Sequence, residues 1–346
     1  MKIGYVPYGR DLTQPADRRR FPYYAEKRGL AYEIADPGAD YDLVIVTPRS
    51  DLDAWSRYRP GTAKLIFDIV DSYLDIPRTN PKALLRGPAK FVAGEARTPF
   101  FTYRGALERI LRRADATTCA TPEQAAAIRP LCPNVHPILD FQTRMITTVK
   151  EDYRASEPFN LVWEGLGENA RWFSAIREPL AEISRKRPVV LNLVTAIHFK
   201  QLSQRFWTRE TAAIVRKSFD EVRVHQWSEE TVASVATMCD LALIPLPLDR
   251  PLEAGKPESK LISFWRMGLP TVTSATAAYT RVMSAAGESL HCATDSEWVN
   301  ALEGLIESEA ARERAGRAGR AYAESHYSDE RLSEAWDAAL ESIQHP

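Results

Sequence analysis

Residues 239–274 read CDLALIPLPLDRPLEAGKPESKLISFWRMGLPTVTS. The apolar run 241–245 (LALIP) leads into a loop rich in proline, and a helix-capable segment then ends at Gly268, just before the second apolar run, 270–274 (PTVTS). Short apolar runs without alternation are typical of parallel strands that helices cover on both faces. A glycine followed by proline is a common end of a helix. The stretch therefore predicts strand, loop, helix and strand within an α/β sheet.

Runs of the same kind occur along the chain in two series, separated by helix-capable stretches. The first series holds 2–6, 42–47, 64–68 and 116–120, and the second begins near Phe159 and continues with 189–195, 221–225, 241–245 and 270–274. Two such series predict two Rossmann-like domains facing each other across a ligand-binding cleft. We expect an N-terminal domain over 1–140, a linker over 141–158, a C-terminal domain over 159–325, and a helix over 326–346 that packs back toward the N-domain.

The composition narrows the possible partners. Lys plus Arg number 45 against 46 Asp plus Glu, and this formal net charge of -1 gives no overall attraction for nucleic acid. The four cysteines form no CxxC pair, which favours reduced thiols in a cytoplasmic protein and predicts no metal site. No apolar stretch of about 18 residues occurs, so we expect neither a classical secretion signal nor a membrane span.

An ordered set of residues in the opening stretch resembles the donor-site segment of family 4 and related GT-B glycosyltransferases. The matching residues are Asp240, Pro245, Leu246, Gly255, Lys256, Lys260, Leu261, Gly268, Leu269 and Pro270. The resemblance implies a nucleotide-diphosphate-sugar co-substrate, transfer with retention of configuration, and no required metal or other cofactor. Many family members carry two glutamates eight positions apart, the second contacting the donor ribose, where this chain has Gly255 and Ser263. Glu253, Glu258 or the Ser263 hydroxyl could replace them.

The predicted helix near Pro257 suits a diphosphate, because the first amides of a helix are unpaired and its start is electropositive. Lys256 and Lys260 could neutralise the leaving diphosphate, although most lysines are simply solvated surface charges. By resemblance, the predicted donor-binding residues are Gly165, Gly167, Arg171, His225, Gln226, Trp227, Glu258, Ser259 and Ser263. Alternatives remain for several of them: a tight turn for the glycines and core packing for Trp227.

Candidate acceptor residues lie in the first half of the chain. The stretch KLIFDIVDSYLD (64–75) resembles a family segment rich in aspartate, and Asp68 and Asp71 match it. Either carboxylate could position or deprotonate an acceptor hydroxyl, or could instead cap the following helix. Gly9 and Arg10 occupy the place of the family's first acceptor-side loop.

Residues 82–113 are basic, with aromatic residues among the cations. This composition predicts an acceptor-facing surface that could touch a membrane or a lipid-linked acceptor, unless the aromatics point inward and the arginines form a solvated helix face. We therefore expect a glycosyltransferase acting on a glycan, a lipid-linked acceptor or a protein. The alternatives are a sugar-nucleotide epimerase of the same fold and a non-catalytic binding domain.

Overall fold

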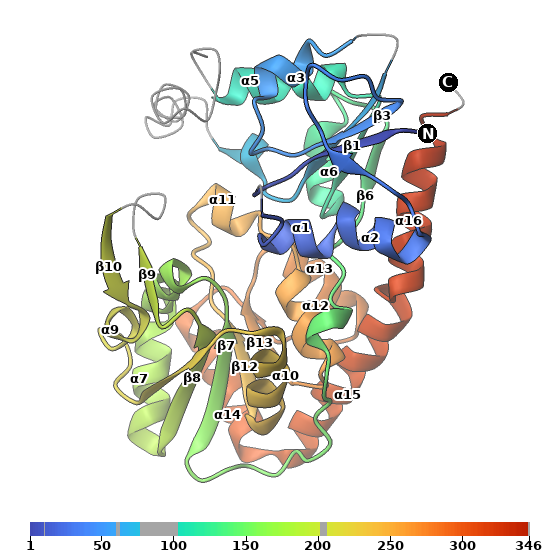
Figure 1. Ribbon diagram of the computed structural model, residues 1–346. Coiled ribbons are helices and arrows are strands. Elements are labelled where there is room, and N and C mark those ends of the chain that lie inside the picture. The colour runs from blue at the N-terminus through green and yellow to red at the C-terminus, as the bar shows by residue number, and fades with distance from the viewer. Residues whose placement is uncertain (10, 60–62, 77–102, 201–205, 345–346) are drawn as a thin grey trace. The chain divides into compact units, whose positions relative to one another are not determined.

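The computed structural model describes residues 1–346 except 10, 60–62, 77–102, 201–205 and 345–346 (Figure 1). The chain forms two compact units. Unit 1 comprises Met1–Phe141, Gly255–Pro257 and Asp329–Pro346, and unit 2 comprises Gln142–Ala254 and Glu258–Ser328. Each unit contains a parallel six-stranded sheet, which confirms the predicted pair of Rossmann-like α/β domains.

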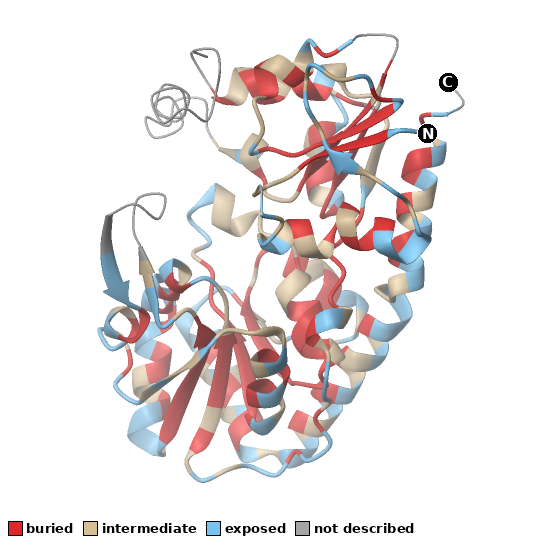
Figure 2. Ribbon diagram, viewed as in Figure 1, coloured by how far each residue is buried: buried red, intermediate tan, exposed pale blue. Residues whose placement is uncertain are grey.

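Unit 1 has the strand order β2-β1-β3-β4-β5-β6, with every neighbouring pair parallel. Its strands are β1 (Ile3–Val6), β2 (Glu33–Ile34), β3 (Leu43–Val46), β4 (Lys64–Ile69), β5 (Ala116–Cys119) and β6 (Val135–Pro137). Its helices include α1 (Pro15–Arg19), α2 (Phe21–Arg28), α3 (Leu52–Ser56), η1 (Tyr73–Asp75), α5 (Tyr103–Arg113) and α6 (Pro122–Ile128). The central strands are buried throughout (Figure 2), as expected for a sheet between helices.

The last helix of the chain, α16 (Asp329–Glu341), completes the core of unit 1. It packs against α2, β5 and β6. The fully buried Trp336 ring stacks on Tyr24, with centroids 5.6 Å apart, and meets Phe21 edge-on at 5.9 Å. The expected return of the C-terminal helix to the N-terminal domain is thus observed for α16.

Unit 2 has the strand order β11-β8-β7-β12-β13-β14, again entirely parallel. Its strands are β7 (Phe159–Glu164), β8 (Val189–Thr195), β11 (Val222–Gln226), β12 (Leu241–Ile244), β13 (Thr271–Ser274) and β14 (His291–Cys292). Its helices include η2 (Thr143–Met145), η3 (Gly167–Ile176), α7 (Arg177–Lys186), α9 (Thr211–Val215), α10 (Glu229–Met238), α11 (Pro251–Ala254), α12 (Ser259–Arg266), α13 (Ala277–Ala285), α14 (Asp295–Glu307) and α15 (Glu309–His326).

All nine predicted strands are present within about one residue at each end. Most of them are short and largely apolar runs, which give a clear local signal. The strands β2, β6 and β14 were not predicted, since two or three residues give no readable period. A two-stranded hairpin, β9 (His198–Lys200) and β10 (Phe206–Glu210), was also not predicted. Among the described residues, no helix combines the length and apolar character needed to span a membrane.

Candidate functional site

The carboxyl ends of the unit 2 strands bring together two of the predicted donor-site residues, Gly165 and Lys260. Gly165 directly follows β7, and Lys260 lies in the first turn of α12. The Lys260 ammonium nitrogen is 4.8 Å from the centroid of the Trp163 ring. A Cβ added to Gly165 would lie 2.7 Å from that ring and 2.8 Å from the ammonium nitrogen. The absence of a side chain at residue 165 therefore lets the cation approach the backbone after β7.

Gly167 also lies where a side chain would not fit. An added Cβ would approach Thr211 Oγ1 to 2.6 Å and the Phe199 ring to 2.8 Å, so the start of η3 packs tightly on the hairpin and α9. Arg171, by contrast, is exposed, and its guanidinium lies 3.9 Å from the Glu253 carboxylate. Gly167 is therefore required for close packing, and Arg171 forms a long ion pair with Glu253.

The three predicted base-pocket residues lie at the end of the edge strand β11. The indole nitrogen of the half-buried Trp227 donates to Glu164 Oε1 at 2.9 Å, which ties this ring to the end of β7. Trp227 is therefore not a simple core residue. The His225 ring nitrogen Nε2 lies 3.0 Å from Asn192 Oδ1, and burial lowers the pKa of His225. The exposed Gln226 accepts from the Ile197 amide at 3.4 Å.

Around the start of α12, two predicted ribose contacts are instead buried within unit 2. Glu258 is 1% exposed, and its Oε1 accepts from Arg281 at 2.9 Å and from the Tyr327 hydroxyl at 3.0 Å. Burial raises the pKa of Glu258. The Ser263 hydroxyl donates to Gln142 Oε1 at 2.6 Å and is also buried. Both side chains therefore serve internal packing, while Ser259 opens α12 immediately before Lys260.

In unit 1, Asp68 is in the core rather than at an open position. Both its side chain and that of Arg20 are fully buried, and Arg20 Nε donates to Asp68 Oδ1 at 2.8 Å. The Thr118 hydroxyl donates to the same oxygen at 2.7 Å. Arg20 also donates to Asp140 at 3.0 Å. Because Asp68 has no exposed surface, it is not placed to contact an acceptor hydroxyl, and that interpretation is corrected to a buried ion pair in the core of unit 1.

Asp71 remains partly exposed beside a lysine. The Lys256 ammonium nitrogen lies 3.6 Å from Asp71 Oδ1, with 30% and 36% of the two side chains exposed. The Ser72 hydroxyl donates to the Gly255 carbonyl at 2.7 Å, which holds this loop on unit 1. A Cβ on Gly255 would lie 2.6 Å from the Ser72 Cβ, so a glutamate at residue 255 would not fit this packing. The two predicted lysines thus belong to different units.

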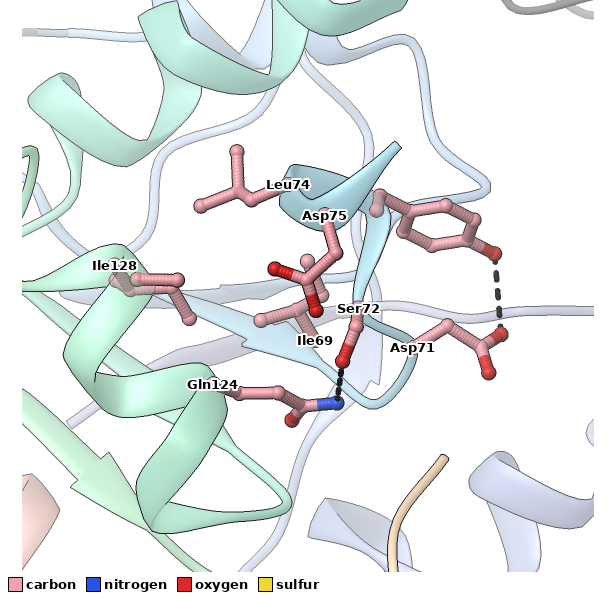
Figure 3. A pocket seen from close by; sticks show the side chains of 9 residues that line it. Ile69, Asp71, Ser72, Leu74, Asp75, Gln124 and Ile128 are labelled. Atoms are coloured by element: carbon pink, nitrogen blue, oxygen red, sulfur yellow. Dashed lines mark hydrogen bonds between the residues drawn. The ribbon is translucent and has the colours of Figure 1, made fainter. Parts of the chain in front are cut away.

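Next to Asp71, a small hollow opens between β4, η1 and α6 (Figure 3). Gln124 Nε2 donates to the Ser72 hydroxyl at 3.0 Å, and the Tyr73 hydroxyl donates to Asp71 Oδ2 at 3.2 Å. Burial of its carboxylate raises the pKa of Asp75. The hollow has a volume of about 10 Å³, which is the room that one water molecule needs. It is too small to hold a sugar.

Gly9 is held by a carboxylate that sequence reasoning missed. Asp17 Oδ2 accepts from the Gly9 amide at 2.9 Å, and Oδ1 accepts from the Tyr8 amide at 2.8 Å and the Tyr5 hydroxyl at 2.7 Å. Asp17 and Arg20 lie in the charged run ADRRR (16–20), a composition typical of solvated helix faces. The predicted Arg10 lies outside the described residues.

The basic segment 82–113 is described only from Tyr103 onward, and its earlier residues lie outside the described chain. Within α5, Tyr103 is buried in the core. The arginines of α5 pair with acids: Arg104 and Arg112 with Glu108, Arg109 with Asp53, and Arg113 with Asp115. This part of the segment is therefore an ordinary ion-paired helix face. Among the described residues, no group of His, Cys, Asp and Glu is arranged to hold a metal.

Comparisons with known proteins place the chain by fold. No family model matches it, and no curated protein is significantly similar in sequence. Sucrose-phosphate synthase from Thermosynechococcus elongatus is similar in structure, with a TM-score of 0.63 and 14% identity over 98% of this chain and 80% of that one. TarM is similar with a TM-score of 0.60 and 10% identity.

A mutant of S. aureus TarM in complex with fondaparinux, alpha-GlcNAc-glycerol and UDP has a TM-score of 0.57 and 10% identity. Both TarM comparisons cover 92% of this chain and 57% of TarM, so the chain spans a little over half of that protein. At these identities the likeness shows a fold shared with GT-B glycosyltransferases.

Proposed function

We propose that this chain is a glycosyltransferase that moves a sugar from a nucleotide-diphosphate donor to an acceptor hydroxyl. The observation that carries the proposal is the Lys260 ammonium beside Gly165, where the carboxyl end of β7 meets the first turn of α12. Phosphate oxygens can approach the main chain closely at a glycine, and a neighbouring ammonium group can bind them there. The GT-B neighbours support the reaction class, and one of them is a complex with UDP and a sugar-glycerol.

In this proposal Lys260 acts when the bond between the anomeric carbon and the diphosphate oxygen breaks. Negative charge then grows on the leaving phosphate, and an ammonium already in place stabilises that charge without reorganisation. The Trp163 ring under the ammonium excludes water from one side, which strengthens this interaction. The acceptor oxygen forms the new bond to the anomeric carbon, and its proton passes to the leaving phosphate. The family resemblance supports retention of configuration in this step.

Further residues of each unit have proposed roles. Trp227, held by Glu164, offers a flat wall for the nucleotide base, with His225 and Gln226 on the adjoining strand end. On unit 1, Asp71 is the preferred acceptor-side carboxylate, because it is exposed while Asp68 is not. Gly9 belongs to the proposed acceptor loop, and the acceptor is a glycan, a lipid-linked sugar or a protein.

The test begins with thermal shifts in UDP-, GDP-, ADP- and CMP-sugars. A ligand at 100 times its dissociation constant stabilises the fold by about 2.7 kcal/mol. With the donor so identified, Lys260→Ala should lower turnover about ten- to a thousandfold, on the scale of one lost charged contact in the transition state. Lys186→Ala, which removes an exposed and ion-paired lysine of the same unit, is the matched control and should leave turnover unchanged.

The products separate the candidate functions. A transferase releases nucleoside diphosphate slowly without acceptor, an epimerase interconverts donor sugars, and a non-catalytic domain does neither. Wild-type turnover in a folded Lys260→Ala protein would remove the phosphate assignment.

A further inference from the structure

Unit 2 contains a cavity of about 520 Å³ at the opposite end of its sheet from Lys260. It is lined by α7, the start of β8, and the segment 216–221 between α9 and β11 (elements in Figure 1). We propose that this basic cavity binds a phosphate-bearing organic ligand independently of the proposed donor site. The proposal does not depend on transferase activity.

The lining has cations around an apolar base. Phe219, Val189 and Ala181 contribute apolar surface, and Phe219 and Val189 are themselves buried. The cationic lining residues are Arg177, Arg185, Arg216 and Lys217, and the acidic ones are Asp220 and Glu221. Four cations against two acids make this cavity locally basic in a chain whose formal net charge is -1.

Three of the four cations are available to a ligand. Arg216 lies 3.7 Å from Glu210. Across the described part of unit 2, Arg177, Arg185 and Lys217 form no ion pair, and all three are exposed. Unpaired like charges lining one hollow repel one another, and an anion relieves that repulsion. Guanidinium groups in particular bind phosphate through paired hydrogen bonds.

The cavity is separate from the proposed donor site because it lies at the amino ends of the strands. It includes Val189, the first residue of β8, whereas the Gly165 amide donates to the Val194 carbonyl near the other end of that strand at 3.3 Å. A strand rises about 3.3 Å per residue, so five residues separate the two places by roughly 16 Å. One phosphate group cannot reach both.

The size and polarity of the cavity indicate the class of ligand. Its volume lies within the roughly 300–1,000 Å³ of small-molecule sites. Phosphate oxygens would meet the arginines, while Asp220 and Glu221 could accept hydrogen bonds from hydroxyl or amino groups of the same ligand. A hydroxylated phosphate ester fits this pattern. Such a group occurs on free sugar phosphates and nucleotides and also on phospholipid headgroups.

Calorimetric titration of the full chain with inorganic pyrophosphate tests whether a soluble phosphate compound binds in the cavity. We expect Arg185→Gln with Lys217→Gln to remove one binding site, or to weaken it about tenfold or more, because each cation supplies a charged hydrogen bond. Arg314→Gln with Arg317→Gln removes the same charge from exposed positions of α15 and should have no effect. Binding at the cavity should persist in Lys260→Ala, which separates it from the proposed donor site.

Sedimentation of the same variants with phosphatidylglycerol and phosphatidylcholine vesicles tests whether a phospholipid headgroup binds in the cavity. Binding to the anionic vesicles alone, lost in the Arg185→Gln, Lys217→Gln protein, supports the cavity as a headgroup site. If wild type binds neither pyrophosphate nor anionic vesicles, or the double variant binds both as wild type does, the proposal is overturned. Pyrophosphate binding that disappears only in Lys260→Ala would likewise overturn it while leaving the transferase proposal intact.

Discussion

Arg20 Nε donates to Asp68 Oδ1 at 2.8 Å between two side chains that have no exposed surface. Removing one partner from a buried ion pair typically costs about 3–5 kcal/mol of unfolding free energy, and after substitution of Asp68, Asp140 is the carboxylate that still pairs with Arg20. We predict a loss of this size for Asp68→Asn, measured by urea denaturation.

Asp71→Asn is the control for that substitution, since the Lys256–Asp71 pair is partly exposed and should contribute at most about 1 kcal/mol. A wild-type stability for Asp68→Asn would contradict the assignment of Asp68 to the core.

Gly165→Ala should weaken donor binding, because the new methyl group would lie 2.8 Å from the Lys260 ammonium and 2.7 Å from the Trp163 ring. Either the loop or the ammonium must move, and we expect the donor dissociation constant to rise about tenfold, the scale of one charged hydrogen bond. Isothermal titration with the identified nucleotide sugar measures this change.

Gly304→Ala is the matched control for the glycine substitution. Its Cβ would meet open space within helix α14, so the substitution should raise stability by roughly 0.5–1 kcal/mol and leave donor affinity unchanged. Equal donor affinity in the two alanine variants would show that the space beside Lys260 is not needed.

Asp17→Asn should disturb the proposed acceptor loop. The Asp17 carboxylate accepts three hydrogen bonds, from the Tyr5 hydroxyl and the amides of Tyr8 and Gly9, and an asparagine leaves one of those donors facing an NH₂ group. We expect a loss of about 1–3 kcal/mol in stability and a raised KM for the acceptor. Donor hydrolysis without acceptor should be unchanged.

The neighbouring exposed Asp11 provides the comparison for Asp17, because its carboxylate accepts hydrogen bonds from the amide and the hydroxyl of Thr13 in the same loop. Asp11→Asn should keep the wild-type acceptor KM. A raised acceptor KM accompanied by a fall in donor hydrolysis for Asp17→Asn would indicate general unfolding instead.

Burial lowers the pKa of His225 below 6.5, with the charge of Arg223 acting in the same direction. The folded state therefore favours the neutral ring. The resulting stability is present above pH 6.5 and is lost as the pH falls through the folded-state pKa. His225→Gln should reduce the fall in unfolding free energy between pH 7.5 and 5.5, measured by urea denaturation.

His136 has its pKa lowered by burial as well, so His136→Gln should reduce the pH dependence further when combined with His225→Gln. An NMR titration of the His225 ring with a midpoint at or above 6.5 would contradict the prediction.

The sequence predicted the sheets better than the side-chain contacts around them. Runs such as LVIV in β3 identify buried strands because the signal is local and repeated. Asp68 and Asp71 look alike in sequence, yet one lies in the core and one is exposed, because Arg20, 48 positions before Asp68, is its partner. No local pattern records such a distant partner.

The same limit applies in unit 2. The ordered match indicated Lys260 and a separate resemblance indicated Gly165, and the structure brings these two residues together. Glu164 was missed because its partner, Trp227, follows a strand 63 positions later. The burial of Glu258 depends on Arg281 and Tyr327, which lie on later elements of the chain. Local spacing predicts which residues share an element, whereas tertiary contacts decide what each carboxylate does.

The assignment of α16 to unit 1 has a consequence for the order in which the nascent chain can fold. A ribosome releases residues 1–141 first, but the core of unit 1 at that stage lacks Trp336, which packs on Phe21 and Tyr24. Unit 2 needs no residue beyond Ser328. The second unit can therefore complete its core before the first, and the apolar faces of α2, β5 and β6 stay uncovered until synthesis has passed the last helix.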